Sequence, residues 1–504
     1  MVGFFRKYHK WLGLFFALFL IIYSLSGIVL NHRDLFSGVE VNRKFMPDRY
    51  TYHNWNMGAL RGSQAIGQDS ILMYGNMGVW LADGNLENLK DFSQGLETGM
   101  DNHKVYTVHL SQAGHLYMGT LTGAFVRNSQ LNKWEKIDIE THDERFVDIT
   151  EKDGKIILLA RSYIYISEDH PESLSFERIN LKNPVDYDNK ISLFKTMWFV
   201  HSGEIYGDWG ILLVDLLGLV FIFLSLGGVI YFFIPKKIKK NYKDGKSIEK
   251  TKGFHRWNLR WHNKIGYWFI ALLLVTSITG VFLRPPGLIA IAYAKVAKIP
   301  FTTLSSPSAW FDKLRAIEYD SLRGEYLVLT DEWAYSVDTS FQEIPKLFAT
   351  QPPISIMGVN VFEQRAKDSY LVGTFAGLFL WQPEKHFILD FENQEEYVPS
   401  EGYGSPFRNS SITGIVRNNN KEIFFVDYDS GIHSMNKSIT PPQMPEVILS
   451  RPISLWNYAL EVHTGRFFSF IFGGFYILIV PIVGLGTIFI LISGFIVWWK
   501  RHRK

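Results

Sequence analysis

Four long apolar runs set the pattern of the chain. They cover residues 11–30, 211–234, 265–283 and 467–499. A helix needs about 20 apolar residues to cross the hydrocarbon core of a bilayer, and each run is long enough to do so. The fourth run could form one helix of about 50 Å at ~1.5 Å per residue, so we expect it to project beyond the membrane on one side. The pattern therefore predicts four transmembrane helices.

The two long stretches that separate these runs have the short period of β-strands. Each contains three segments that read as two strands around a turn. The six segments are ILMYGNMGVWLADG (71–84), HLYMGTLTGAFVRN (115–128), KIILLARSYIYISED (155–169), GEYLVLTDEWAYSVD (324–338), DSYLVGTFAGLFLWQ (368–382) and EIFFVDYDSGIHSM (422–435). A period of about 40–45 residues is typical of β-propeller blades. Half a propeller would leave open strand edges, so we expect both stretches to close one propeller of about six or seven blades. Two separate β-sandwich-like domains are the alternative.

The apolar runs come in two related pairs, which indicates a tandem duplication. A shift of 253 residues places His9 on His262, Gly13 on Gly266, and SLSG (24–27) on SITG (277–280). A shift of 262 places FVHSGEIYG on EVHTGRFFS, and a shift of 266 pairs Gly218 with Gly484 and Gly228 with Gly494. Both halves run in the same direction, so we expect a pseudo-twofold axis along the membrane normal.

Lysine and arginine residues predict the orientation. They gather in the first ten residues, in the loop 235–264 and in the final KRHRK (500–504). Basic segments next to transmembrane helices stay in the cytoplasm. We therefore expect a multi-pass protein of the bacterial inner membrane, with cytoplasmic termini and with both long stretches in the periplasm.

The expected fold class is thus a membrane α part with a periplasmic all-β part. Its segments are transmembrane helix 1 (1–32), the first β half (33–198), helix 2 (199–235), a basic cytoplasmic loop (236–263), helix 3 (264–284), the second β half (285–458), and helix 4 with its tail (459–504).

Composition narrows the chemistry. The chain of 504 residues has no cysteine, so disulfides, thiolate metal sites and iron–sulfur clusters are excluded. The net charge is only +3, which gives no indication of a nucleic-acid partner. A buried metal or haem would need histidine, methionine or carboxylate ligands.

Four of the fifteen histidines stand at the ends of the apolar runs. His9 and His262 are expected at the cytoplasmic ends of helices 1 and 3, and His201 and His463 at the outer ends of helices 2 and 4. Taken singly, such a histidine is more often a headgroup contact than a ligand. The duplication places equivalent copies opposite each other, however, and two facing imidazoles are what a low-spin b-type haem needs.

The hypothesis is therefore two b-type haems, one on each side of the membrane. His9 and His262 would ligate the iron of the inner haem, and His201 and His463 the iron of the outer haem. Glycine at i+4 of HxxxG would keep the helix face free of a side chain that collides with the porphyrin. Arg33, Arg284 and Arg466 are candidate propionate partners outside, although snorkelling explains them equally well.

Two further polar residues interrupt the symmetry. His32 lies in LNHRD at the outer end of the first run, where the second repeat has Arg284. It is a candidate alternative haem ligand, or a proton or propionate contact. Asp215 lies inside the second run, where an ionisable group is costly and often functional. A hydrogen bond between helices is the alternative role for Asp215.

The motifs HKWLG…LSGIVLNH, FVHSGEIYG…LGGVIYFF, WHNKIG…ITGVFL and EVHTGRFF…SGFIVWWKR resemble the PepSY-associated transmembrane helix family. That family includes inner-membrane ferric-siderophore reductases and iron-regulated membrane proteins. The resemblance covers the four helices and implies b-type haems ligated at His9, His201, His262 and His463, with electrons passed to periplasmic ferric complexes. The β stretches show no clear PepSY module, so the resemblance leaves the acceptor open.

The expected function is therefore a transmembrane haem-dependent reductase that acts on a periplasmic ferric chelate. The chain has no nucleotide-binding loop or dinucleotide motif. Its electrons would come from quinol or from a separate cytoplasmic reductase. The alternative is a membrane-anchored propeller that binds or senses a ligand without redox chemistry.

Overall fold

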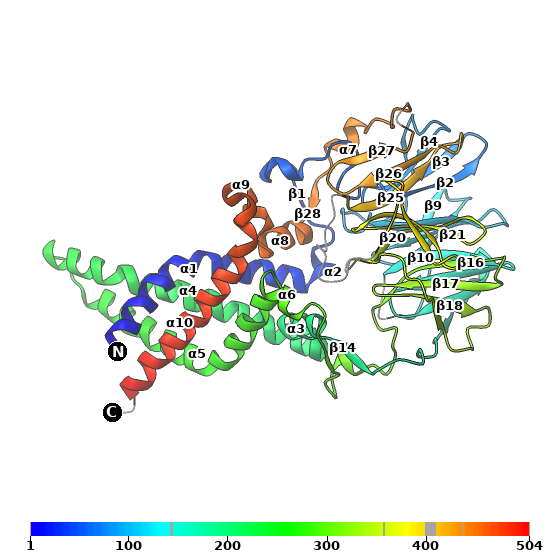
Figure 1. The fold of residues 1–504 in the computed structure, drawn as a ribbon. Coiled ribbons are helices and arrows are strands. Elements are labelled where there is room, and N and C mark those ends of the chain that lie inside the picture. The colour runs from blue at the N-terminus through cyan, green and yellow to red at the C-terminus, as the bar shows by residue number, and fades with distance from the viewer. Residues whose placement is uncertain (1, 142–144, 356–357, 399–409, 437, 503–504) are drawn as a thin grey trace. The chain divides into compact units, whose positions relative to one another are not determined.

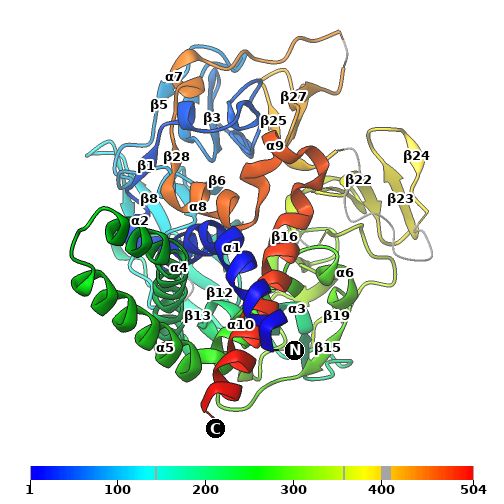
Figure 2. The same ribbon diagram turned by 90° about the vertical axis from the view of Figure 1, so that its left-hand side faces the viewer.

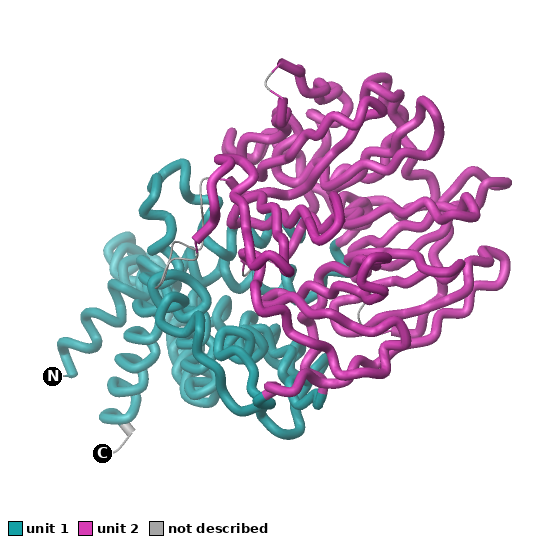
Figure 3. The backbone as a smooth tube through the Cα atoms, turned by 45° about the vertical axis from the view of Figure 1, so that its right-hand side comes forward, with its two compact units in different colours: residues 1–36, 188–307, 455–504 teal, residues 37–187, 308–454 magenta. Residues whose placement is uncertain are grey.

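The computed structural model describes residues 2–141, 145–355, 358–398, 410–436 and 438–502. These form two compact units (Figure 3). The helical unit contains residues 1–36, 188–307 and 455–504, and the β unit contains residues 37–187 and 308–454. The last two residues of the basic tail, 503–504, lie outside the described residues.

Among the described residues, four helices long and apolar enough to cross a membrane dominate the helical unit. They are α1 (Val2–Asn31), α4 (Gly207–Lys243), α5 (Glu249–Phe282) and α10 (Ile479–His502). Helices α1 and α5 each pack against both α4 and α10, so the equivalent helices of the two repeats stand at opposite corners of the bundle. Both chain ends lie at the same end of this unit (Figures 1 and 2).

The fourth apolar run is not a single helix, so that expectation was wrong. It begins with η6 (Arg466–Phe468), α9 (Ser469–Phe472) and η7 (Gly473–Leu478), and only then continues as α10. The backbone of Gly473 has a φ of 52°, which ends α9 because this left-handed region suits glycine. Pro481, in the first turn of α10, needs no backbone donor there.

The shorter elements of the helical unit flank these helices. They are α2 (Arg33–Phe36), α3 (Leu193–Ser202), η4 (Glu204–Tyr206), α6 (Gly287–Ile291), η5 (Thr303–Ser305), α8 (Leu455–His463) and the paired strands β14 (Lys190–Ser192) and β15 (Lys295–Ala297).

In the described residues, the β unit consists of six groups of antiparallel strands, three from each long stretch. The first three groups are β2–β5 (Gly62–Gly67, Ser70–Gly75, Gly78–Ala82, Lys90–Asp91), β6–β9 (Val105–Leu110, Leu116–Thr120, Ala124–Asn128, Lys133–Lys136) and β10–β13 (Phe146–Lys152, Lys155–Ala160, Ile164–Glu168, Glu177–Ile179). The next three are β16–β19 (Leu314–Asp320, Glu325–Thr330, Ala334–Asp338, Lys346–Leu347), β20–β24 (Val359–Ala366, Ser369–Thr374, Gly377–Gln382, Phe387–Asp390, Glu395–Glu396) and β25–β27 (Ile412–Arg417, Ile423–Asp427, Gly431–Ser434). Each of the six predicted segments forms one antiparallel strand pair.

The remaining elements of the β unit are short. They are β1 (Glu40–Val41) paired with β28 (Ile453–Ser454), the 3₁₀ turns η1 (Arg43–Phe45), η2 (Asp48–Tyr50) and η3 (Pro171–Ser173), and α7 (Glu446–Leu449).

Neighbouring strand groups pack through a cyclic series of hydrophobic clusters. The first strands contact one another in the order β2, β6, β10, β16, β20, β25 and again β2. The cluster around Trp80 and Phe424 fills the interface between the sixth and first groups. β2 and β25 also pair in parallel, with Gly62 opposite Ile415, which merges these two groups into one seven-stranded sheet. The two long stretches therefore share one β unit.

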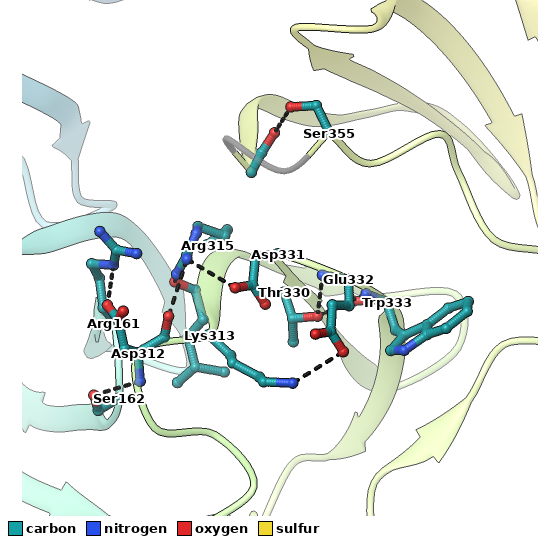
Figure 4. A network of polar contacts seen from close by, with 12 residues as sticks. Arg161, Ser162, Asp312, Lys313, Arg315, Thr330, Asp331, Glu332, Trp333 and Ser355 are labelled. Atoms are coloured by element: carbon teal, nitrogen blue, oxygen red, sulfur yellow. Dashed lines mark hydrogen bonds and ion pairs between the residues drawn. The ribbon is translucent and has the colours of Figure 1, made fainter. Parts of the chain in front are cut away.

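A second seam between the two stretches is polar (Figure 4). Arg161 Nε lies 2.7 Å from Asp312 Oδ1, and the Asp312 backbone N–H donates to Ser162 Oγ at 3.0 Å. The Leu314 N–H donates to the Arg161 carbonyl at 2.8 Å. These contacts fix β16 of the second stretch beside the turn between β11 and β12 of the first.

Carboxyl groups on the first strands face each other inside the β unit. Burial, followed by the nearby negative charges of Asp148 and Glu363, raises the pKa of Glu318 to about 8. Burial also raises the pKa of Asp148 to about 7, against the lowering effect of the N–H groups of Ile317 and Ile149. The fold therefore favours the protonated acids, and stability should fall as pH rises from the unfolded value of about 4.3 toward these raised values.

The Glu318→Gln variant tests this. Its unfolding midpoint should fall less than that of the wild type between pH 4.5 and 8.5, by about 2 °C or more, since glutamine cannot ionise. Scanning calorimetry of the full chain in detergent measures the difference. Glu177→Gln, at an exposed site on β13, is the control and should follow the wild type. An identical pH dependence of all three proteins would contradict the prediction.

Candidate functional site

The structure brings His9 and His262 together inside the helical bundle. His9 lies on α1 and His262 on α5, the two equivalent helices at opposite corners. Their ring centroids are 6.3 Å apart, with the ring planes at 84°.

His201 and His463 form a second pair. His201 lies in the last turn of α3 and His463 is the last residue of α8, so each precedes a long helix. Gly203 and Gly465 follow two residues later with φ values of 88° and 78°, and this left-handed conformation lets the chain turn from the short helix toward the bundle. The two ring centroids are 6.1 Å apart, with the planes at 59°.

Each of the four imidazoles lies against a glycine from the other repeat. An added Cβ would stand 2.8 Å from His9 Cε1 at Gly494, 2.9 Å from His201 Cε1 at Gly280, 3.3 Å from His463 Cε1 at Gly27 and 3.2 Å from His262 Nδ1 at Gly227. The glycines of the HxxxG motifs do not have this role, because Gly13 has no atom within 4 Å of its Cβ position and Gly266 has only Leu224.

Three of the histidines are held through Nδ1. His9 Nδ1 bonds the Ile490 carbonyl at 2.9 Å, His201 Nδ1 the Thr276 carbonyl at 3.0 Å, and His463 Nδ1 the Tyr23 carbonyl at 3.0 Å. A carbonyl only accepts, so Nδ1 carries the proton and Nε2 keeps a lone pair. Ring nitrogens held in this way are typical of metal-ligating histidines. The arrangement leaves each Nε2 able to bind a metal.

A serine or threonine hydroxyl supports each of these bonds. The Nδ1 atoms lie 3.3 Å from Ser493 Oγ for His9, 3.3 Å from Thr279 Oγ1 for His201 and 3.0 Å from Ser26 Oγ for His463. Ser26 and Thr279 occupy equivalent repeat positions, in SLSG and SITG. The duplication has thus repeated the hydroxyl that contacts Nδ1 as well as the histidine.

His262 is the exception to this support. Its buried Nδ1 makes no hydrogen bond to a hydroxyl among the described residues, and it faces the carbonyl of Leu224, which matches Ile490 at a shift of 266 residues. Gly227 stands at the position that Ser493 occupies in the other repeat, at a shift of 266 residues, so the hydroxyl is missing. Asn258, which is buried, instead donates its amide to the Gly227 carbonyl at 2.9 Å.

The geometry of both pairs suits two imidazoles on opposite sides of one metal. A metal–imidazole bond is about 2.0 Å and the ring centre lies about 1.1 Å behind the nitrogen, which puts the centroids of two such ligands about 6.2 Å apart. The observed 6.3 and 6.1 Å agree with this. The described residues contain no group of three or more His, Asp or Glu side chains that could hold a metal, so these sites are pairs.

The two pairs lie on different levels of the bundle. His9 is on α1 itself, and His463 contacts α1 at Ser26 and Gly27. These α1 positions are about 26 Å apart at ~1.5 Å per residue, close to the ~30 Å thickness of a bilayer core.

Polar atoms without partners lie next to the His201/His463 pair. Tyr23 Oη is buried without a hydrogen bond in the described structure, and the Tyr23 ring is 5.7 Å from that of His463. Arg284 Nε is likewise buried and unbonded, and its guanidinium interacts electrostatically with Arg466, Tyr476, Glu461 and Tyr23. A phenol and a guanidinium in such a position can bind a carboxylate.

His32 is not part of either pair. Its Nε2 hydrogen-bonds Asp215 Oδ2, and Asn31 Nδ2 donates to Asp215 Oδ1 at 2.9 Å. Asp215 therefore makes the hydrogen bond between helices that the sequence left open for it. Arg33 lies 3.8 Å above the Trp456 ring, in a cation–π contact.

Three features of the site were not predicted from the sequence. They are the carbonyls and the hydroxyls that contact Nδ1, and the glycines of the other repeat that contact the rings. A signal for them was present, because Ser26/Thr279, Gly27/Gly280 and Gly228/Gly494 match in the repeat alignment. That alignment shows which positions are equivalent, but it does not show which histidine each position contacts.

Among the described residues, fold and site together define a membrane protein with four long apolar helices, two half-buried histidine pairs and a β unit. The model of the PepSY-associated TM region matches residues 6–501, so the chain belongs to this family. No curated protein matches the chain.

Several solved structures are similar at low identity. The extracellular domain of BT4673 from B. thetaiotaomicron has 12% identity and a TM-score of 0.34, with 76% of this chain and 39% of that chain covered. The extracellular domain of BT3049 from the same organism has 12% identity and a TM-score of 0.35, with coverages of 77% and 40%. The computationally designed protein Ika8 has 9% identity and a TM-score of 0.30, with coverages of 76% and 89%. The matched part thus spans about two fifths of the two extracellular domains.

Substitution of the contact glycines tests the seating of the rings. Alanine in a helix is normally more stable than glycine by about 0.5–1 kcal/mol. At Gly280 and Gly494 we expect the reverse, because the new Cβ would stand within 2.9 Å of His201 or His9. Gly280→Ala and Gly494→Ala should lower the thermal unfolding midpoint in detergent. Gly253→Ala, on α5 with no atom within 4 Å of the added Cβ, should not. Equal unfolding midpoints for Gly280→Ala, Gly494→Ala and Gly253→Ala would show that the histidine rings do not pack against Gly280 and Gly494.

Proposed function

We propose that this protein is a b-type haem protein that carries electrons between two centres on opposite sides of the membrane and reduces an acceptor outside the cell membrane. The observation that carries the proposal is the two half-buried histidine pairs, whose ring spacings of 6.3 and 6.1 Å would suit two imidazole ligands on one iron each. A bound haem supplies one-electron redox chemistry at its iron. His9 and His262 would hold one haem, and His201 and His463 the other.

The residues around the pairs have defined tasks in this function. The Nδ1 bonds to helix carbonyls fix the ring orientation and raise the basicity of Nε2, which stabilises the oxidised metal. The contact glycines allow the ring edges to approach the neighbouring helices closely. Arg284 and Tyr23 are suited to bind the propionates of the haem at His201 and His463.

The orientation we propose follows the basic residues. Both chain ends lie at the same end of the helical unit. The segment 236–263, predicted as a loop, is the end of α4, the connection 244–248 and the start of α5. It contains eight lysines, which favours the cytoplasm for this side. The protein would then lie in a bacterial inner membrane with its β unit in the periplasm.

The acceptor we propose is a ferric chelate of the siderophore type. Reductases of the family that this chain resembles act on such complexes, and iron(III) takes one electron, as a haem delivers it. The donor would be quinol or a cytoplasmic reductase.

We also propose that the β unit is a six-bladed propeller. The cyclic contacts of β2, β6, β10, β16, β20 and β25 support this, as does the hydrophobic cluster between each group and the next. The parallel pairing of β2 with β25 would join the first and last blades.

The first test is a reduced-minus-oxidised absorption spectrum of the purified full chain, with haem quantified per chain. We expect about two b-type haems with the sharp bands of bis-histidine iron. A featureless spectrum from folded protein expressed with added haem would overturn the proposal and favour a binding or sensing role for the β unit.

Single variants assign the two centres. His9→Ala and His262→Ala should each remove one haem and leave the other, because each breaks the same pair. His201→Ala and His463→Ala should remove the second haem. His53→Ala, at an exposed position of the β unit, is the control and should retain both. Two haems in both His9→Ala and His262→Ala would show that this assignment is wrong.

A further inference from the structure

Asp215 is an ionisable residue inside the apolar helix α4, and the proposed haem sites do not account for it. Asp215 is the one charged residue of the run 211–234 on α4. An ionisable side chain in a membrane span costs several kcal/mol and usually marks a functional site.

Asp215 and His32 form a hydrogen-bonded dyad. Asp215 accepts from His32 Nε2 through one oxygen and from Asn31 Nδ2, at 2.9 Å, through the other. The carboxylate only accepts, so it fixes the proton of His32 on Nε2 and leaves the lone pair on Nδ1. The aspartate of a catalytic Asp–His pair orients a general base in this way. The side chain of His32 is 27% exposed and that of Asp215 only 13%, so the open nitrogen belongs to the more accessible partner.

The dyad is absent from the second repeat. At the exact repeat shift of 253 residues the position of His32 is taken by Pro285, directly after Arg284, and at the shift of 266 residues Pro481 stands in place of Asp215. Both histidine pairs are built by the two repeats alike, so holding these pairs does not require the dyad. Its task is therefore separate from the support of the rings.

The position of the dyad connects it to one histidine pair. Gly27 of α1 contacts His463, and Asn31 lies one turn further along the same helix face, about 6 Å away. On one side of Asp215 along the surface of α4 lies Gly218, which packs against Ile28 of α1. On its other side lie two exposed leucines, Leu212 (54% exposed) and Leu219 (55% exposed). The dyad thus borders both the His201/His463 pair and the lipid-facing surface.

We propose that the His32–Asp215 dyad is the proton-accepting part of a binding site for a membrane-soluble hydroquinone, which gives its electrons to the centre at His201 and His463. This inference rests on the proposed function. A hydroquinone loses a proton with each electron, so its oxidation needs a base next to an electron acceptor. An apolar hydroquinone also reaches such a site from the bilayer, past the exposed leucines.

The oxidation proceeds in two one-electron steps. In each step one O–H bond of the hydroquinone breaks, the proton goes to Nδ1 of His32, and the electron would leave to the one-electron acceptor that His201 and His463 would hold. His32 passes each proton to water. After both steps the hydroquinone is a quinone, two protons have left, and two electrons have passed to the centres that the two histidine pairs would hold. His32 is the catalytic base, while Asp215 and Asn31 position its ring.

Two centres are useful because the electron donor and the electron acceptor transfer different numbers of electrons. A hydroquinone supplies two electrons, whereas iron(III) accepts one. Two one-electron centres, one at each histidine pair, would let the protein use a two-electron donor for successive one-electron reductions.

Stopped-flow reduction by decylubiquinol tests the proposal. The oxidised full chain, in nanodiscs without oxygen, should show haem reduction that is at least 10-fold slower in His32→Gln and Asp215→Asn than in the wild type. Both variants should contain the wild-type amount of haem and be fully reduced by dithionite. His53→Gln should reduce at the wild-type rate. Equal rates in all four proteins would overturn the site.

A binding measurement on protein without bound haem gives a second readout. Decylubiquinol should slow hydrogen–deuterium exchange of peptides from α2 and from the first turns of α4 in the wild type, and less so in His32→Gln. Protection that is equal in both proteins, or absent from both, would overturn the site. Failure of the proposed function is distinguishable, because it appears as missing haem in the spectrum while the exchange result still reports on the dyad.

Discussion

The helical unit depends on how it holds four imidazoles in an apolar bundle. A neutral imidazole has one N–H that needs an acceptor, and the bilayer offers none. Helix carbonyls of Ile490, Thr276 and Tyr23 provide it, and glycines bring the backbone close enough to do so. Every ring packs against a glycine of the other repeat. The contacts that leave Nε2 able to bind a metal therefore also hold the two halves of the bundle together.

Much of this arrangement could be predicted from the sequence. The apolar runs gave the four long helices, and the repeat alignment gave the partners His9 with His262 and His201 with His463. The six strand pairs also followed from local patterning, since a hairpin depends on alternation and on its turn.

Other features could not be predicted, because they depend on packing between distant segments. The glycines that contact the histidines are an example, because each lies on a helix of the other repeat and local spacing does not reveal that helix. The predicted role of the HxxxG glycines beside a porphyrin stays a prediction. The fourth run read as one helix because hydropathy does not register the positive φ of Gly473. The dyad of His32 and Asp215 joins α1 to α4, so neither residue could be assigned its partner from its own surroundings.

The pairing of β2 with β25 has a consequence for biosynthesis. Residues 62–67 are among the first strand residues to be made, yet their neighbour, residues 412–417, comes about 350 positions later, after the two long helices α4 and α5. Non-local strand pairing is slow to form, and an unpaired edge is open to wrong partners. The first β half must therefore wait across the insertion of α4 and α5 with one edge uncovered. We expect the chain to depend on chaperones most during this interval, and the mature protein to need them least.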